Sequence, residues 1–166
     1  MVSAETLCRV RRRLCVQPHR LDPRPDSSAQ PFRVTFKSKI SLGGWQLPSD
    51  RARPGEVVRV GLYWEALSDL SDDDWLKIQL VDARGNFLLY KDGSPSVGRD
   101  STDSCRQGEK IASWHRLTIP LQTPSGVYCL IIGLHPYGRK KWLPIDEENL
   151  PTVLGDQLML AEVRIE

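Results

Sequence analysis

Apolar and polar residues alternate along much of this chain, most clearly between residues 57 and 66. Every second residue there is apolar, and the residues between are mostly polar: Val58, Val60, Leu62, Trp64 and Ala66 against Arg59, Gly61, Tyr63 and Glu65. Successive side chains of a strand point to opposite faces, so this period of two predicts a strand with one buried face. The preceding Arg53-Pro54-Gly55-Glu56 is typical of a turn.

The same pattern recurs between turn signals from residue 32 to the end of the chain. Gly85 stands in a hairpin loop at 83–86, where a positive φ costs glycine little. Glu162 interrupts the alternation of the last segment, which predicts a β-bulge. We find no amphipathic helix pattern after residue 31, so the sequence predicts an all-β protein, an immunoglobulin-like antiparallel β-sandwich. The seven to eight strands fall in eight segments: 32–36, 40–47, 57–67, 75–82, 87–91, 110–120, 127–135 and 157–165.

The segment Pro124-Ser125-Gly126-Val127-Tyr128 resembles the turn and tyrosine that open the sixth strand of many immunoglobulin-like domains. In those domains the tyrosine hydroxyl bonds back to the main chain, and a disulfide cysteine follows two residues later. Here Cys129 follows Tyr128 directly, so it must face the opposite side of the strand. We therefore expect no disulfide of the antibody type.

Residues 1–31 differ from residues 32–166, which we expect to form the β-sandwich domain. The first segment is an irregular, basic, proline-containing N-terminal arm, although residues 5–15 could form a short helix. Residues 1–32 contain six Arg and three acidic residues, which leaves a net charge of −1 for the rest of a chain whose total is +2. The arm arginines Arg11, Arg12 and Arg13 are candidates for contact with nucleic acid or acidic headgroups, but a solvated tail explains them more simply.

Composition narrows the possible functions only moderately. A length of 166 residues suits one domain with a substantial core. A net charge of +2 argues against nucleic acid as a partner. No apolar run has the length that a membrane helix needs, and the basic start does not look like a secretory signal. The four cysteines, Cys8, Cys15, Cys105 and Cys129, fit no paired zinc pattern, and we expect thiols.

Residues that could support catalysis or bind metal do not form a recognisable motif. The histidines are His19, His115 and His135, and no nucleophile motif accompanies them. Because His115 belongs to the apolar series of its strand, a buried, hydrogen-bonded side chain is the simplest interpretation. Acidic residues cluster between Asp69 and Asp74, where calcium is conceivable but a solvated loop is simpler. We expect no enzyme and no cofactor.

Aromatic residues give a more informative candidate surface. Segments 57–67 and 110–120 correspond to the second and fifth strands of such a sandwich, which are neighbours in one sheet. Tyr63 and Trp114 belong to the outward series of these two segments, with Arg116 beside Trp114. An exposed aromatic patch with polar neighbours suits a protein partner or a sugar ring. The alternative is that the N-terminal arm or loops cover it. Trp75 and Trp142 are further candidates at loop edges. The basic segment 139–141 could contact phosphate, but the acids at 146–148 would also make it a balanced surface.

From residue 32 onward the chain resembles a known family. It is similar to the β-sandwich domain at the extracytoplasmic C-terminus of some bacterial multi-spanning membrane glycosyltransferases, a module that also occurs alone. The order and spacing of the matching segments agree over about four-fifths of the chain. The segments are Ile40-Ser41-Leu42-Gly43-Gly44-Trp45, Arg53-Pro54-Gly55-Glu56, Leu62-Tyr63-Trp64-Glu65-Ala66-Leu67, Gln79-Leu80-Val81-Asp82-Ala83-Arg84-Gly85, Asp92-Gly93-Ser94-Pro95, Gly108-Glu109-Lys110-Ile111, Pro124-Ser125-Gly126-Val127-Tyr128 and Gly133-Leu134.

The resemblance implies an accessory or interaction module and transfers no catalytic residue, since the membrane-spanning catalytic part is missing. Where the family often has Trp before the turn of the fifth strand, this chain has Ser104-Cys105-Arg106-Gln107. Two functions follow: a non-catalytic module that docks on a protein partner or larger assembly with help from the arm, or a carbohydrate-binding accessory module. The resemblance implies an extracytoplasmic location, whereas the missing secretory signal and the expected thiols favour the cytoplasm.

Overall fold

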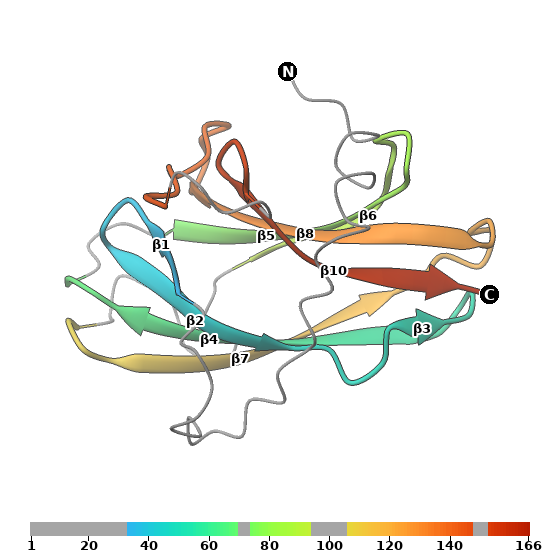
Figure 1. The fold of residues 1–166 in the computed structure, drawn as a ribbon, viewed down its shortest axis with the longest axis horizontal. Helices are drawn as coiled ribbons and strands as arrows, with labels where there is room; N and C mark the ends of the chain where they lie inside the picture. Colours follow the sequence, from blue (N-terminus) through green and yellow to red (C-terminus); the bar gives the residue numbers. More distant parts are fainter. Residues whose placement is uncertain (1–32, 70–73, 94–105, 148–152) are drawn as a thin grey trace.

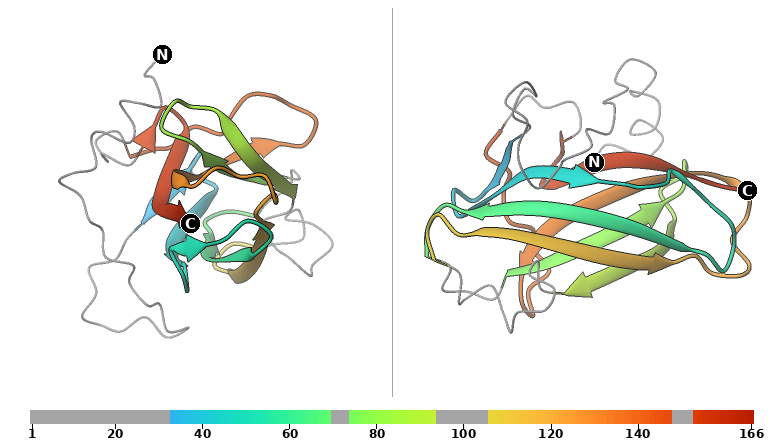
Figure 2. Two further views of the ribbon diagram at one scale, coloured as in Figure 1. Left: turned by 90° about the vertical axis from the view of Figure 1, so that its right-hand side faces the viewer. Right: turned by 90° about the horizontal axis from the view of Figure 1, so that it is seen from below.

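A computed structural model of the chain describes residues 33–69, 74–93, 106–147 and 153–166. Two β-sheets pack face to face in these residues, and no described segment is helical (Figure 1). This arrangement confirms the predicted all-β sandwich. Figure 2 shows that the strands of the two sheets are not aligned but cross at an angle. The described part of the chain contains no helix with the length and hydropathy needed to cross a membrane.

Sheet A has the strand order β1-β2-β4-β7 and is antiparallel throughout. Its strands are β1 (Val34–Phe36), β2 (Ile40–Gln46), β4 (Val57–Ala66) and β7 (Lys110–Thr118). The predicted segments 57–67 and 110–120 form β4 and β7, and they pair along their whole length, with Gly61 opposite Trp114. This pairing confirms that the outward series of the two strands share one face.

Sheet B has the order β3-β10-β8-β5-β6, with β9 paired to β10. Its strands are β3 (Arg51–Ala52), β5 (Asp74–Val81), β6 (Phe87–Gly93), β8 (Gly126–Pro136), β9 (Val153–Leu154) and β10 (Gln157–Ile165). The short β3 runs parallel to β10, which ties the segment before β4 to the opposite sheet. Neither β3 nor β9 was predicted, because two residues are too few to show a period.

The core lies between the sheets and is built from the predicted inward series. Val58, Val60, Leu62, Trp64 and Ala66 are all buried, and the Trp64 ring contacts Phe36 with centroids 5.9 Å apart. The predicted bulge in the last strand is present, between Met159 and Ala161 rather than at Glu162. The extra residue, Leu160, therefore joins the same core as Leu158.

The entry to β8 is as predicted. The Tyr128 hydroxyl donates to the Pro124 carbonyl oxygen at 2.9 Å, four residues upstream. Tyr128, Leu130, Ile132 and Leu134 face the core, as the parity of the strand required. Cys129 faces away from that core and forms no disulfide among the described residues. It belongs to a separate buried cluster on the outer side of sheet B, with Val81, Ile131 and Met159.

Candidate functional site

The outer side of sheet A carries the first candidate site, which we call the Trp114 face: Gln46, Arg59, Tyr63, Trp114 and Arg116. The Trp114 indole lies over the backbone of Gly61, so that a Cβ added to Gly61 would come within 3.0 Å of a ring carbon. The indole is nevertheless 44% exposed. A glycine at the opposite position thus lets a large ring lie flat on the sheet while its other face meets solvent.

Polar groups surround this ring. The Tyr63 hydroxyl, on the strand next to Trp114, donates to Gln46 Oε1 at 3.3 Å. Arg59 and Arg116 are direct cross-strand partners, and both are exposed. Two cations opposite each other on one face of an antiparallel pair repel. No ion pair within the described residues relieves that repulsion, so the face is well suited to an acidic surface.

The structure thus brings three of the predicted residues, Tyr63, Trp114 and Arg116, onto one solvent-facing surface. Arg59 and Gln46 complete it, and the sequence analysis did not single them out as part of a site. The parity of β4 had already placed Arg59 outward, but only the register of the pairing shows that it lies opposite Arg116. The predicted arm residues Arg11, Arg12 and Arg13 lie outside the described residues.

The other two predicted aromatic residues lie on the opposite side of the molecule, on the outer face of sheet B. The turn after β8 folds back there, because Leu143 N donates to the Leu134 carbonyl at 2.7 Å. The returning chain lays the Trp142 ring on Gly133, where an added Cβ would lie only 2.7 Å from two ring carbons. Trp75, at the start of β5, stacks against Tyr137 with ring centroids 4.7 Å apart and planes tilted by 39°.

Polar side chains join these rings. His135 meets the edge of Trp142 at 5.8 Å between centroids, and its Nε2 lies 3.2 Å from Asp92 Oδ1. Lys77 Nζ lies 3.8 Å from the other Asp92 oxygen and 4.5 Å from the centroid of the Tyr90 ring. We call Trp75, Lys77, Asp92, His135, Tyr137 and Trp142 the β8-turn cluster. The sequence analysis named only Trp75 and Trp142 among these residues.

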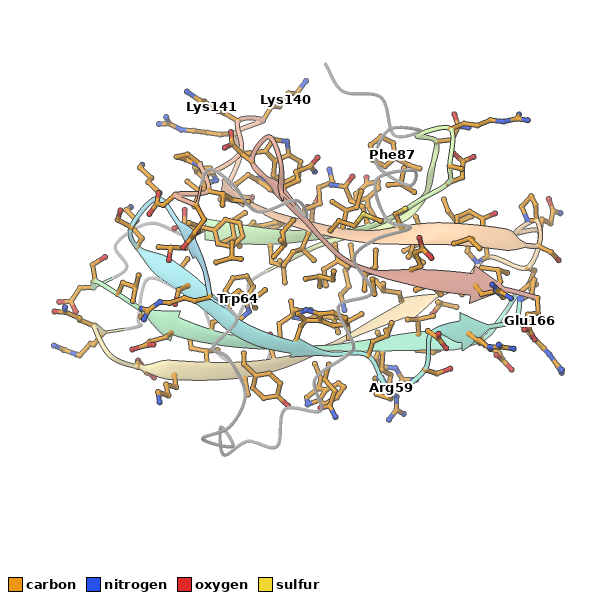
Figure 3. The ribbon with its side chains drawn as sticks, in the orientation of Figure 1. Arg59, Trp64, Phe87, Lys140, Lys141 and Glu166 are labelled. Atoms are coloured by element: carbon orange, nitrogen blue, oxygen red, sulfur yellow. The ribbon has the colours of Figure 1, made fainter. Side chains whose placement is uncertain are left out.

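The basic segment Arg139, Lys140 and Lys141 lies between Tyr137 and Trp142 in the sequence and is exposed. Of the acids expected to balance it, Glu148 lies outside the described residues, and the other two bond to neighbouring main-chain groups. Asp146 accepts hydrogen bonds from the Ser38 amide and hydroxyl at 2.8 and 2.9 Å, and Glu147 accepts one from the Thr35 amide at 2.8 Å. Both carboxylates therefore turn toward β1. Figure 3 shows Lys140 and Lys141 extending outward on the sheet B side, away from Arg59 on the opposite side.

Two buried polar side chains of β7 form a pair in the core. Ser113 Oγ and His115 Nε2 are 2.9 Å apart, and the residues are 2% and 3% exposed. Burial, with a smaller effect from the Lys91 charge, lowers the pKa of His115 to about 4. The imidazole is thus neutral at pH 7, as expected for a buried, hydrogen-bonded histidine.

The acidic segment between Asp69 and Asp74 is described only in part. Asp69 accepts a hydrogen bond from the Gln107 amide at 2.9 Å, and Asp74 is buried at the start of β5. Asp72 and Asp73 lie outside the described residues. Over the ranges that the structure covers, no three His, Cys, Asp or Glu side chains come together in a way that could hold a metal ion.

No protein-family model and no curated protein sequence matches this chain. Several solved structures are similar to it. The C-terminal domain of Wzt is 15% identical, with a TM-score of 0.52 over 87% of this chain and 83% of that one. A Niemann-Pick type C2 protein from the Japanese carpenter ant is 9% identical, with a TM-score of 0.44 over 83% and 96%. The CARDB domain of PF1109 from Pyrococcus furiosus is 11% identical, with a TM-score of 0.43 over 88% and 100%.

At these identities the similarity to the Wzt domain supports the β-sandwich fold and nothing finer. The expected link to membrane glycosyltransferases remains an expectation from the sequence motifs. The chain is thus a β-sandwich domain with two aromatic, basic surfaces on opposite sides.

Proposed function

We propose that the protein is a non-catalytic interaction module that docks on a partner protein through the Trp114 face. The observation that carries this proposal is Trp114 itself, held flat over Gly61 with 44% of its surface exposed. An indole ring fixed in one orientation loses little conformational entropy on binding, and Trp, Tyr and Arg are enriched among the residues that dominate binding energy. All three residue types occur on this face.

Charge indicates what kind of partner surface fits. Arg59 and Arg116 repel each other in the free protein, because they are cross-strand partners without a described acidic neighbour. A carboxylate placed between the two guanidinium groups would replace this repulsion by two attractive interactions. We therefore expect a partner that covers the Trp114 ring with apolar surface and places an acidic side chain beside it.

The buried pair Ser113 and His115 supports the non-catalytic part of the proposal. A serine and a histidine at hydrogen-bond distance are the first two parts of a nucleophilic site. Their side chains, however, are almost completely enclosed by the core. A substrate would have to open the sandwich to reach Ser113 Oγ, so a structural role for the pair is the better interpretation.

The direct experiment is affinity capture from the native lysate with the tagged full-length chain, followed by mass spectrometry and by titration of the purified partner. Trp114→Ala and the charge reversal Arg116→Glu are expected to weaken binding at least tenfold. Phe87→Ala is the matched control, since Phe87 is an aromatic residue 67% exposed on sheet B. Equal binding by all variants would mean that the partner docks elsewhere.

A second candidate function, binding of carbohydrate, is favoured by one specific observation. The β8-turn cluster combines rings at different tilts with polar side chains that are partly buried, since the side chains of Asp92 and His135 are 27% and 16% exposed. Sugars present an apolar C–H face and a rim of hydroxyls, which suit rings and directional polar groups respectively. Tryptophan fluorescence on addition of glycans tests this candidate: no change in emission would count against it.

A further inference from the structure

The β8-turn cluster has a basic rim whose charges are not used within the fold. No ion pair within the described residues involves Arg139, Lys140 or Lys141. Two of the acids that follow in the sequence, Asp146 and Glu147, bond to the turn after β1 and to β1 instead. Three adjacent cations without an ion pair among the described residues raise the affinity of the neighbouring surface for an anion.

The charges inside the cluster do not offset this rim. Asp92 is the acidic residue of the cluster, and both of its oxygens are engaged, one with His135 at 3.2 Å and the other with Lys77 at 3.8 Å. Its charge is therefore directed toward Lys77 and His135. Lys140 and Lys141 belong to the turn that joins Tyr137 to Trp142, and they extend into solvent on the sheet B side (Figure 3).

The rings themselves are arranged for a small rigid ligand rather than for a flat protein surface. Tyr137 is 65% exposed and is fixed by its stacking on Trp75. Trp142 is fixed differently, between Gly133 and the His135 ring, whose plane is nearly perpendicular to it at 85°. The cluster thus offers ring surfaces in more than one plane, whereas the Trp114 face presents one ring lying flat on the sheet.

We propose that the β8-turn cluster and its basic rim bind an acidic sugar, a glycan whose rings carry carboxylates. The apolar face of a sugar ring would pack on Tyr137 and Trp142, and its carboxylate would pair with Lys140 and Lys141. This inference rests on the carbohydrate-binding candidate and adds the charge of the ligand. It is independent of the docking proposed for the Trp114 face.

The test uses the full-length chain and a pair of matched probes, trigalacturonic acid and the same trisaccharide with its carboxylates reduced to hydroxymethyl groups. Binding is measured by calorimetry and by tryptophan emission at low and high salt. We expect the acidic trisaccharide to bind at least tenfold more tightly than the neutral one, and salt to remove most of the difference. Comparable binding of both probes would overturn the acidic preference and leave the carbohydrate-binding function standing.

Variants locate the site. Lys140→Glu combined with Lys141→Glu is expected to weaken binding of the acidic trisaccharide at least tenfold without affecting the fold, because both side chains are exposed. Tyr137→Ala is expected to weaken the binding of both trisaccharides to the same extent. Arg84→Glu is the matched charge control, as Arg84 is an exposed cation at the turn between β5 and β6. Unchanged binding in the lysine variant would overturn the assignment.

Two further outcomes separate the possible failures. If neither trisaccharide binds, both this inference and the carbohydrate-binding candidate fail together. If a hexaglutamate peptide binds more tightly than trigalacturonic acid and depends on the same lysines, the basic rim recognises an acidic protein segment, and the assignment to sugar is wrong.

Discussion

Two tryptophans lie directly on glycines, one on each sheet, and these contacts decide how both candidate sites are presented. A Cβ on Gly61 would lie 3.0 Å from the Trp114 ring, and a Cβ on Gly133 would lie 2.7 Å from the Trp142 ring. A glycine inside a strand costs roughly 0.5–1 kcal/mol relative to alanine. Because these glycines carry no side chain, the two rings can lie flat against the sheets.

Alanine substitutions at these glycines should therefore have different effects. Gly133→Ala is expected to lower the free energy of unfolding by about 1–3 kcal/mol, because the partly buried Trp142 must move. Gly61→Ala should cost less than about 1 kcal/mol, since the half-exposed Trp114 can shift, but it should weaken partner binding tenfold. Gly43→Ala is the control, with its nearest heavy atom at 3.8 Å. Urea denaturation and titration of the partner measure the two effects, and equal stability of all three variants would contradict the packing described.

His115 gives the stability a defined dependence on pH. Its pKa in the folded protein is about 4, below the ordinary value of 6.5, so the unfolded chain binds a proton first as the pH falls. Stability from this group is thus fully present above pH 6.5, is lost between pH 6.5 and about 4, and changes no further below that. At about 1.4 kcal/mol per pKa unit, the loss is roughly 3–4 kcal/mol.

Urea denaturation between pH 7 and pH 4 tests this dependence in the natural sequence and in His115→Gln. The variant is expected to be less stable at pH 7, because it disturbs the bond to Ser113, but to lose less stability on acidification. Parallel curves for the two proteins would show that His115 does not titrate as described.

At the scale of elements, the Tyr128 side chain helps to hold the turn into β8. Tyr128→Phe removes the 2.9 Å hydrogen bond to the Pro124 carbonyl and leaves the packing of the ring in place. We expect a loss of about 1 kcal/mol in the free energy of unfolding, with no change in binding at either face. Denaturant titration measures the loss, and a variant as stable as the natural protein would mean that solvent replaces this bond without cost.

The strands themselves could be predicted from alternation. The inward series of β4 is buried as expected, and the parity of β8 correctly separated Tyr128 from Cys129. The pairing of β4 with β7 then placed Tyr63 and Trp114 on one face. These predictions succeeded because a period of two fixes the face of every residue once one residue is placed.

The β8-turn cluster and the partners of the acidic residues after it depend on contacts between distant segments, which no local sequence pattern contains. The β8-turn cluster requires the chain to fold back after Pro136, so that Trp142 reaches Gly133 and Tyr137 reaches Trp75. Asp146, one of the acids expected to balance the basic segment, bonds to the β1–β2 turn, more than a hundred residues away in sequence. Such pairings depend on tertiary geometry, so the sequence alone could not show them.

At the scale of the molecule, the two candidate sites lie on opposite sides of one sandwich (Figure 3). The sheets pack through a continuous apolar core, which separates the two outer faces. The effects of substitutions at such distant sites are expected to add. Trp114→Ala should therefore leave the affinity for trigalacturonic acid unchanged, and Lys140→Glu with Lys141→Glu should leave the affinity for the partner protein unchanged. Calorimetry on both variants measures this, and loss of both activities in either variant would contradict independent sites.

The measurement that tests the central claim most directly is site-specific photo-crosslinking from position 112. Ala112 is exposed on β7, two residues from Trp114 and directly opposite Tyr63. A photoreactive amino acid there should crosslink the captured partner in the natural background and in Phe87→Ala, and should fail to do so when Trp114→Ala is added. A crosslink of equal yield with and without Trp114, or a partner that crosslinks only from sheet B, would contradict docking through the Trp114 face.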